Sequence, residues 1–237
     1  MIFLRNAKAL VFADSHLGFE EDMSSKGVFI PRAQLSKLLS MLEEAFSHVA
    51  PELLIIAGDV KHIFNKLGRI EKSELDQLFT FIKKHDINEI ILVRGNHDNF
   101  IKFLAKKYDV KIIEKLLLGD ILIIHGHKEI EYDNEKIKTI IMGHEHPSIA
   151  LRDNVGPLVK IPCFLLVPTI HKINLVVLPA AGIYQSGTAV SLIRESYLSP
   201  IIREMAVLEE AKPIALIEKE GSIELPPLRL LVDLLIT

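Results

Sequence analysis

The ten residues LLIIAGDVKH (residues 53–62) hold the pattern on which the fold interpretation depends. An uninterrupted aliphatic run ends at once in Gly58-Asp59. A short apolar run that stops at a glycine and a charged residue is typical of a strand buried on both faces. We therefore predict a buried strand that ends beside Asp59.

The same pattern recurs on both sides of this stretch. AKALVFA (7–13) precedes Asp14, EIILV (89–93) precedes Asn96, ILII (121–124) precedes His125, and TIIM (139–142) precedes His144. Apolar residues at helical spacing over 35–49 and 75–82 separate the first three runs, and Ser73 with Asp76 is a candidate capping box. The order β-α-β-α-β predicts a parallel sheet with crossover helices.

The second half of the chain predicts mostly strands. Short apolar runs follow one another from VKII (110–113) to NLVVL (174–178). We therefore predict the α/β class, as a two-sheet α-β-β-α sandwich whose first sheet is largely parallel and whose second sheet is mixed. We expect one domain over residues 1–237, with a motif-bearing core at about 8–190 and a β-rich tail at about 195–237.

Composition excludes several classes of protein. Lys and Arg number 28 against 31 Asp and Glu, so the net charge of −3 predicts no general nucleic-acid-binding surface. The single Cys163 excludes an internal disulfide and a cysteine-rich zinc module. No charged leader precedes an apolar stretch, and prolines interrupt the most apolar region, 161–183, so we expect a cytoplasmic protein without a membrane span.

Polar residues that bind metals follow the predicted strands. Asp14, Asp59, Asn96, His125 and His144 each stand at or just after the carboxyl end of a run, where α/β sheets bind ligands. Seven of the ten histidines occur in these turns: His16, His62, His97, His125, His127, His144 and His146. Carboxylate and imidazole ligands without thiolates suit Mn, Fe or Zn, and Asp59 is the candidate bridge between two such ions.

The turns together resemble a known signature. They read Asp14-Ser15-His16, Gly58-Asp59, Gly95-Asn96-His97-Asp98, His125 and Gly143-His144-Glu145-His146. This is similar to the five motifs of the calcineurin-like metallophosphoesterases, in the family's order. The resemblance implies two metal sites that share Asp59: one with Asp14, His16 and His146, the other with Asn96, His125 and His144.

The resemblance also implies catalytic roles. His97 would be the general acid or a phosphate contact, and Asp98 would orient its imidazole. A metal-bridging water with a lowered pKa would attack phosphorus. The resemblance implies two divalent ions, with Mn expected first and Fe, Zn or Ni as alternatives.

A closer resemblance extends over roughly residues 10–190. The segments DSHLGFE, GDVKH, VRGNHDN, IIHGH and GHEHPSIALR, with the downstream IPCFLLVP and LVVLPAAG, resemble archaeal phosphoesterases related to the repair exonuclease family. The bacterial ligase-associated phosphodiesterases are similar. This implies a phosphodiesterase that acts on cyclic nucleotides or nucleic-acid ends. The large repair exonucleases carry a further DNA-gripping domain, which we do not predict here.

Some interpretations stay open at this point. His62 and His127 either contact substrate or support the site, or they are structural or solvent-facing residues. Phosphomonoester hydrolysis of a nucleotide or phosphoprotein and a non-catalytic protein-binding scaffold are the alternatives to a phosphodiesterase. A phosphoester substrate is the expected partner, and the apolar end LRLLVDLLIT (228–237) is a candidate contact for a second copy.

Overall fold

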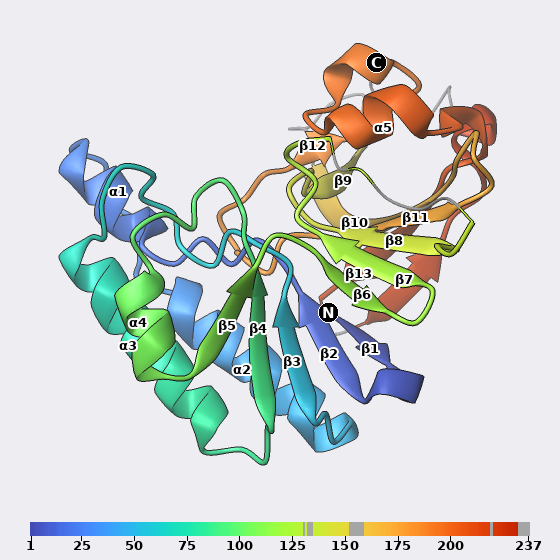
Figure 1. Ribbon diagram of the computed structural model, residues 1–237. Coiled ribbons are helices and arrows are strands. Elements are labelled where there is room, and N and C mark those ends of the chain that lie inside the picture. Colours follow the sequence, from blue (N-terminus) through green and yellow to red (C-terminus); the bar gives the residue numbers. More distant parts are fainter. Residues whose placement is uncertain (130, 132–134, 152–158, 219, 232–237) are drawn as a thin grey trace. The chain divides into compact units, whose positions relative to one another are not determined.

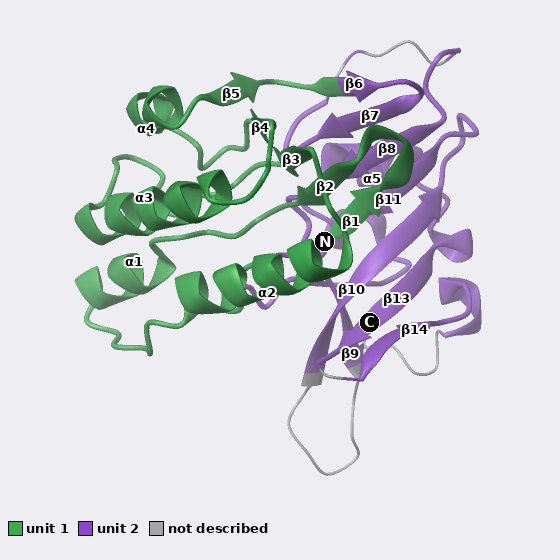
Figure 2. Ribbon diagram, turned by 90° about the horizontal axis from the view of Figure 1, so that it is seen from below, with its two compact units in different colours: residues 1–116, 181–184 green, residues 117–180, 185–237 purple. Residues whose placement is uncertain are grey.

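The computed structural model describes residues 1–129, 131, 135–151, 159–218 and 220–231 (Figure 1). The chain forms two compact units, which are coloured separately in Figure 2. The first unit comprises Met1–Leu116 and Ala181–Tyr184, and the second comprises Leu117–Ala180 and Gln185–Thr237.

The first unit is built on a five-stranded sheet. Its strands, in spatial order, are β1 (Ile2–Leu4), β2 (Ala9–Phe12), β3 (Leu53–Ile56), β4 (Glu89–Val93) and β5 (Val110–Ile113). Only β1 is antiparallel to its neighbour, and the other strands pair in parallel. Phe12 is level with Ile56, and Ile56 is level with Leu92. This register brings the ends of β2, β3 and β4 to one edge of the sheet.

Four α-helices belong to this unit: α1 (Phe19–Ser25), α2 (Gln34–His48), α3 (Arg69–Lys83) and α4 (Lys102–Lys107). A short 3-10 helix, η1 (Arg5–Ala7), joins β1 to β2. Apolar side chains of α2, α3 and α4 form one core with the strands, which includes Leu38, Leu78 and Leu104. Sequence periodicity predicts α2 and α3 because their apolar residues face this core.

The predicted start of α3 was wrong. The helix begins at Arg69, before Ser73, and Glu71 completes a capping box with the amide of Gly68. In addition, the Glu21 carboxylate accepts hydrogen bonds from the amides of Arg69, Ile70 and Glu71. A carboxylate that accepts hydrogen bonds from these otherwise unbonded amides stabilises the helix start. Because this acceptor, Glu21, belongs to α1, it leaves no local pattern at the start of α3.

The second sheet has nine strands among the residues that the structure describes. They are β6 (Leu116–Leu118), β7 (Ile121–Ile124), β8 (Thr139–Met142), β9 (Pro147–Leu151), β10 (Val159–Pro168), β11 (Asn174–Val177), β12 (Thr188–Ala189), β13 (Lys212–Ile217) and β14 (Gly221–Glu224). Their order is β12-β9-β10-β11-β8-β7-β6, with β13 on β10 and β14 on β13. Because β7, β8 and β11 are parallel and Ile124 is level with Met142, the turns after β7 and β8 share an edge.

Short helices complete the second unit: α5 (Pro200–Met205) and the 3-10 helices η2 (Arg194–Ser196), η3 (Leu208–Glu210) and η4 (Leu228–Leu230). Tyr197, Ile202 and Leu228 from the tail are buried in the core of this unit. The tail therefore contributes to the second core. Residues 232–237 of its apolar end lie outside the described residues.

The prediction of a mixed α/β chain with two sheets, the first largely parallel, is confirmed. The face-to-face packing of the sheets and the single domain stay predictions. Among the helices of the described residues, none is long and apolar enough to cross a membrane.

The core of the first unit can be tested at Phe79, which is fully buried in α3. We expect Phe79→Ala to lower the free energy of unfolding by about 3–5 kcal/mol, because it leaves a large cavity. Phe103→Ala is the matched control, since that ring is 72% exposed and should change the value by about 0.5 kcal/mol or less. Urea unfolding measures both, and equal losses would contradict the assignment of Phe79 to the core.

Candidate active site

The turns after β2 and β3 are joined by their backbones. The amide of Asp14 donates to the carbonyl oxygen of Gly58, and the amide of His16 donates to that of Asp59, each at 3.0 Å. Asp14, His16 and Asp59 have φ angles of 58°, 43° and 50°, in the left-handed region. This conformation costs side-chain-bearing residues on the order of 1 kcal/mol each, so the bonds between the turns offset local strain.

The Asp98 carboxylate joins the turn after β4 to the turn after β3. It is buried and accepts hydrogen bonds from the amides of Asp59 (2.8 Å), Val60 (2.9 Å) and Gly95 (2.8 Å). This structural role was not predicted from the sequence. The orientation of the His97 imidazole by Asp98 stays a prediction.

Gly95 allows the carboxylate of Asp59 to lie against the next turn. A Cβ at residue 95 would stand 2.1 Å from Asp59 Oδ1, so only glycine fits there. The same Oδ1 accepts a hydrogen bond from the amide of His97 at 2.8 Å, and Oδ2 lies 3.9 Å from His16 Nε2. The carboxylate of Asp59 is therefore held between two other motif turns, as a shared ligand requires.

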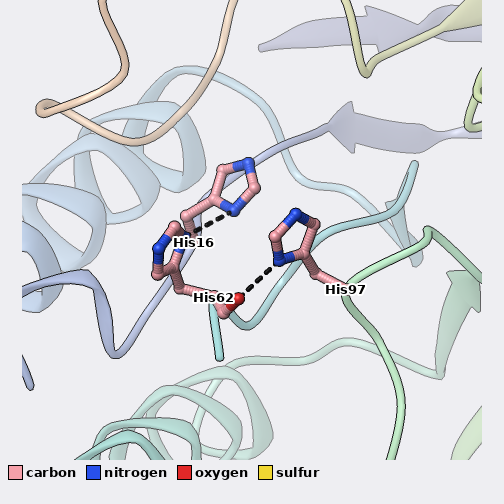
Figure 3. Close-up of side chains that lie close together, drawn as sticks. All are labelled: His16, His62 and His97. Carbon is pink, nitrogen blue, oxygen red and sulfur yellow. Dashed lines mark hydrogen bonds between the residues drawn. The ribbon is translucent and has the colours of Figure 1, made fainter. Parts of the chain in front are cut away.

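Three imidazoles gather beside these turns (Figure 3). The ring centroids of His16, His62 and His97 lie 5.1–5.4 Å apart, and His62 Nδ1 is 3.3 Å from His16 Nδ1. His97 Nδ1 donates a hydrogen bond to the carbonyl oxygen of His62. Because Nδ1 carries this proton, Nε2 is the His97 atom that can exchange a proton with a substrate.

His62 therefore lies within the cluster rather than facing solvent alone. Its Nε2 is 3.4 Å from Asp22 Oδ2, and its ring contacts that of Phe19. Burial lowers the pKa of His62, the neighbouring His97 lowers it further, and Asp22 opposes both effects. One imidazole nitrogen from each of His16, His62 and His97 lies within 4.8 Å of the other two.

A fully buried ion pair supports the loop that carries His62, and the sequence did not reveal it. Lys61 Nζ lies 3.7 Å from Glu71 Oε2 and donates hydrogen bonds to the carbonyl oxygens of Ile63 and His97. The Glu71 carboxylate also accepts hydrogen bonds from the amides of His62 and Ile63. Burial lowers the pKa of Lys61 and raises that of Glu71, while their mutual attraction opposes both shifts.

Further carboxylates hold the segment that follows His16. Glu74 accepts the amide of Gly18 at 2.8 Å, and Glu20 Oε1 accepts the amide of Gln34 at 2.9 Å. Gln34 Nε2 in turn donates to the carbonyl oxygen of Ser15. Gln34 and Glu74 lie outside every motif, and the contacts that reveal their role come from positions far apart in the chain.

The second unit brings together the remaining histidine turns. The ring centroids of His125, His127 and His144 lie 5.0–6.1 Å apart. His144 and His146 have φ angles of 68° and 48°, and a Cβ on Gly187 would stand 1.9 Å from the carbonyl oxygen of His146. These turns therefore also contain strained backbone, and they pack against a position, Gly187, that has no room for a side chain.

The start of the tail supports the same turns. Glu145 is buried, and its carboxylate accepts the amides of Leu198 and Ser199. Ser199 Oγ donates to the carbonyl oxygen of Gly126 at 2.7 Å. The tail, for which the sequence suggested no role, therefore joins the turns after β7 and β8.

The donor groups fit divalent metals. Asp14, His16, Asp59 and His125 are each less than 5% exposed, and each offers an oxygen or nitrogen donor. Carboxylate and imidazole donors without thiolate suit Mn, Fe or Zn. The allocation of seven ligands to two ions and the role of His97 stay predictions.

Comparison with known proteins gives a family and a fold. Residues 7–154 match the model of the calcineurin-like phosphoesterase family, which confirms the resemblance drawn from the motifs. The crystal structure of the nuclease MPE from Pseudomonas putida is 21% identical, with 90% of this chain and 86% of that chain covered and a TM-score of 0.61.

The phosphoesterase YfcE from Escherichia coli is 13% identical, with 92% of this chain and 98% of that chain covered and a TM-score of 0.43. The search of curated proteins found no match. At these identities, the likeness to the MPE structure supports the fold alone.

The joining role of Asp98 can be tested by stability. We expect Asp98→Ala to lower the free energy of unfolding by about 2–4 kcal/mol, because it leaves three amides without their acceptor. Asp86→Ala removes an exposed carboxylate in the same unit and is the matched control. Urea unfolding compares the two variants, and an Asp98→Ala protein as stable as the control would contradict this role.

Glu74 should make stability depend on pH. Burial raises its pKa to about 7, the Gly18 amide opposes this shift, and Glu20 and Glu21 add to it. The folded state therefore holds the proton more tightly than the unfolded state, so this contribution is full below pH 4.5 and is lost as pH rises to about 7.

Between about pH 5 and pH 8, we expect the wild-type protein to lose on the order of 2 kcal/mol more stability than Glu74→Gln, whose side chain does not titrate. Urea unfolding at both pH values measures the difference. Parallel pH dependence in the two proteins would show that Glu74 does not titrate in this range.

Proposed function

Because the chain belongs to the calcineurin-like phosphoesterase family, we propose that it is a metal-dependent phosphodiesterase acting on nucleotide or nucleic-acid-related phosphodiesters. The observation that carries the proposal is the position of Asp59. Its carboxylate lies between His16 and the His97 amide, in turns that backbone bonds and Asp98 hold together. A shared carboxylate beside an imidazole is the arrangement that two-metal hydrolysis needs.

For the two ions we propose seven ligands, taken from the family's motifs: Asp14, His16, Asp59, Asn96, His125, His144 and His146. When bound, two divalent ions lower the pKa of water and offset negative charge on the phosphoryl oxygens. We propose Mn as the metal in use, with Fe, Zn and Ni as the competitors to test against it.

We propose His97 as the general acid for the leaving oxygen. Its Nδ1–H donates a hydrogen bond to the His62 carbonyl oxygen, which fixes the ring. Nε2 is then left to deliver a proton to the leaving oxygen. The side chain is half-buried, so a substrate oxygen can reach it. His62 serves here by positioning His97, and its own ring is a candidate contact for the phosphate.

The role of His97 predicts a dependence on the leaving group. We expect His97→Gln to slow hydrolysis of a dinucleotide by about 10²-fold or more, because a sugar alkoxide needs a proton to leave. Bis-p-nitrophenyl phosphate should be slowed much less, because nitrophenolate leaves without one. Steady-state rates of the Mn-loaded protein on both substrates measure this, and equal losses would refute the acid role.

Metal content separates the proposed metal-dependent enzyme from a non-catalytic scaffold. We expect the chelator-stripped protein to regain about two Mn ions per chain, and Asp59→Asn to regain fewer, because the shared ligand is weakened. Lys83→Gln, on an exposed end of α3, is the control that should bind as the wild type does.

Preference for p-nitrophenyl phosphate over its diester would favour a phosphomonoesterase. Absence of bound metal together with absence of hydrolysis would favour a scaffold. The cytoplasmic location and self-association stay predictions.

A further inference from the structure

Along residues 94–107, exposed cations alternate in sequence with exposed aromatic rings. Phe100 is 62% exposed and Phe103 is 72% exposed. Arg94, Lys102 and Lys106 are exposed as well. We call these five residues the α4 surface. All five belong to the first unit, in which α4 lies beside β5 (Figure 1).

The cations of the α4 surface border a common hollow. Arg94, Lys102 and Lys106 line a cavity of about 410 Å³ together with residues of β5. Lys102 and Lys106 stand four residues apart in α4, so their side chains project from one side of the helix. Among the residues that the structure describes, neither lysine has an ion-pair partner.

Arg94 forms one ion pair, with Glu114 at 3.6 Å, and donates to Asn99 at 2.8 Å. Of the described residues that line the hollow, Glu114 is the only acidic one. The hollow therefore carries a net positive charge on a chain whose total charge is −3. Such a local excess favours a negatively charged partner.

Phe100 combines an unfavourable backbone conformation with an exposed ring. Its φ angle is 65°, a left-handed value that is rare for a bulky residue. The ring also gains little from burial, so neither local conformation nor core packing explains an aromatic residue here. Phe100 stands three residues after His97, at the end of the same turn, so at most about 11 Å of chain separates it from the proposed general acid.

We propose that the α4 surface binds single-stranded nucleic acid as it leads to the active site, with phosphates on the three cations and bases stacked on Phe100 and Phe103. This inference rests on the proposed function and specifies its substrate class. Cations that follow the phosphate backbone, together with aromatic rings that stack on bases, bind single strands without sequence preference. Duplex DNA keeps its bases stacked inside and would leave both rings unused.

The test uses a fluorescent phosphorothioate oligothymidine of about twelve nucleotides, a length in the range that one binding domain covers. Fluorescence anisotropy on the full chain measures affinity, and a gel confirms that the strand stays intact. We expect Phe103→Leu and Phe100→Asn each to weaken binding by about fivefold or more, because leucine and asparagine cannot stack on a base. Asparagine tolerates the left-handed conformation, so the second variant keeps the backbone.

The cations are tested by salt dependence. The double variant Lys102→Gln/Lys106→Gln should reduce the slope of log affinity against log salt by about 0.7 for each lysine removed. The matched control is Lys83→Gln/Lys84→Gln, which makes the same charge change at the exposed end of α3 and should keep the wild-type slope. Phe103→Trp should keep or increase affinity.

Three outcomes would overturn the proposal: no binding by the wild type, equal binding by all variants, or preference for phosphatidylserine vesicles over the strand. Hydrolysis of bis-p-nitrophenyl phosphate by the wild type is measured in parallel. Activity on this small diester without strand binding would overturn the α4 surface alone. Absence of that activity would overturn the proposed function instead.

Discussion

The Asp98 carboxylate is the interaction on which the candidate site depends. It accepts hydrogen bonds from the amides of Asp59, Val60 and Gly95, and so fixes the turn after β4 against the turn after β3. Hydrogen bonds that buried amides donate to a charged acceptor are stronger than hydrogen bonds between neutral groups. Because Gly95 has no side chain, the Asp59 carboxylate can lie between the turns and reach both His16 and the His97 amide.

Buried ionisable side chains form a second layer around these turns. Lys61 connects Glu71 to the carbonyl oxygen of His97, and Glu74 holds the amide of Gly18. Burying charged groups costs stability unless partners compensate, so a protein that needed only a stable core would gain more from apolar side chains here. In the second unit, Glu145 has the corresponding role for the turn that carries His144 and His146.

This construction suits hydrolysis of a charged substrate. The candidate donor groups are held in strained, well-bonded turns that would need little rearrangement to bind the proposed phosphoester, and His97 Nε2 is left for the proposed proton transfer. The same turn continues into the exposed Phe100 and the cations of α4. A single segment of about fourteen residues thus carries both the proposed acid and the proposed contacts to a longer substrate.

By itself, the sequence determined the strands that end at the motif turns, the parallel order of the first sheet and the family, because apolar periodicity and motif spacing are local properties of the chain. Only the tertiary structure decided the roles of Asp98, Lys61, Glu71 and Glu145, and it moved the start of α3 to Arg69. These side chains act on amides and carbonyls that are distant in sequence. Their partners depend on how the elements meet in space, and no local pattern carries that information.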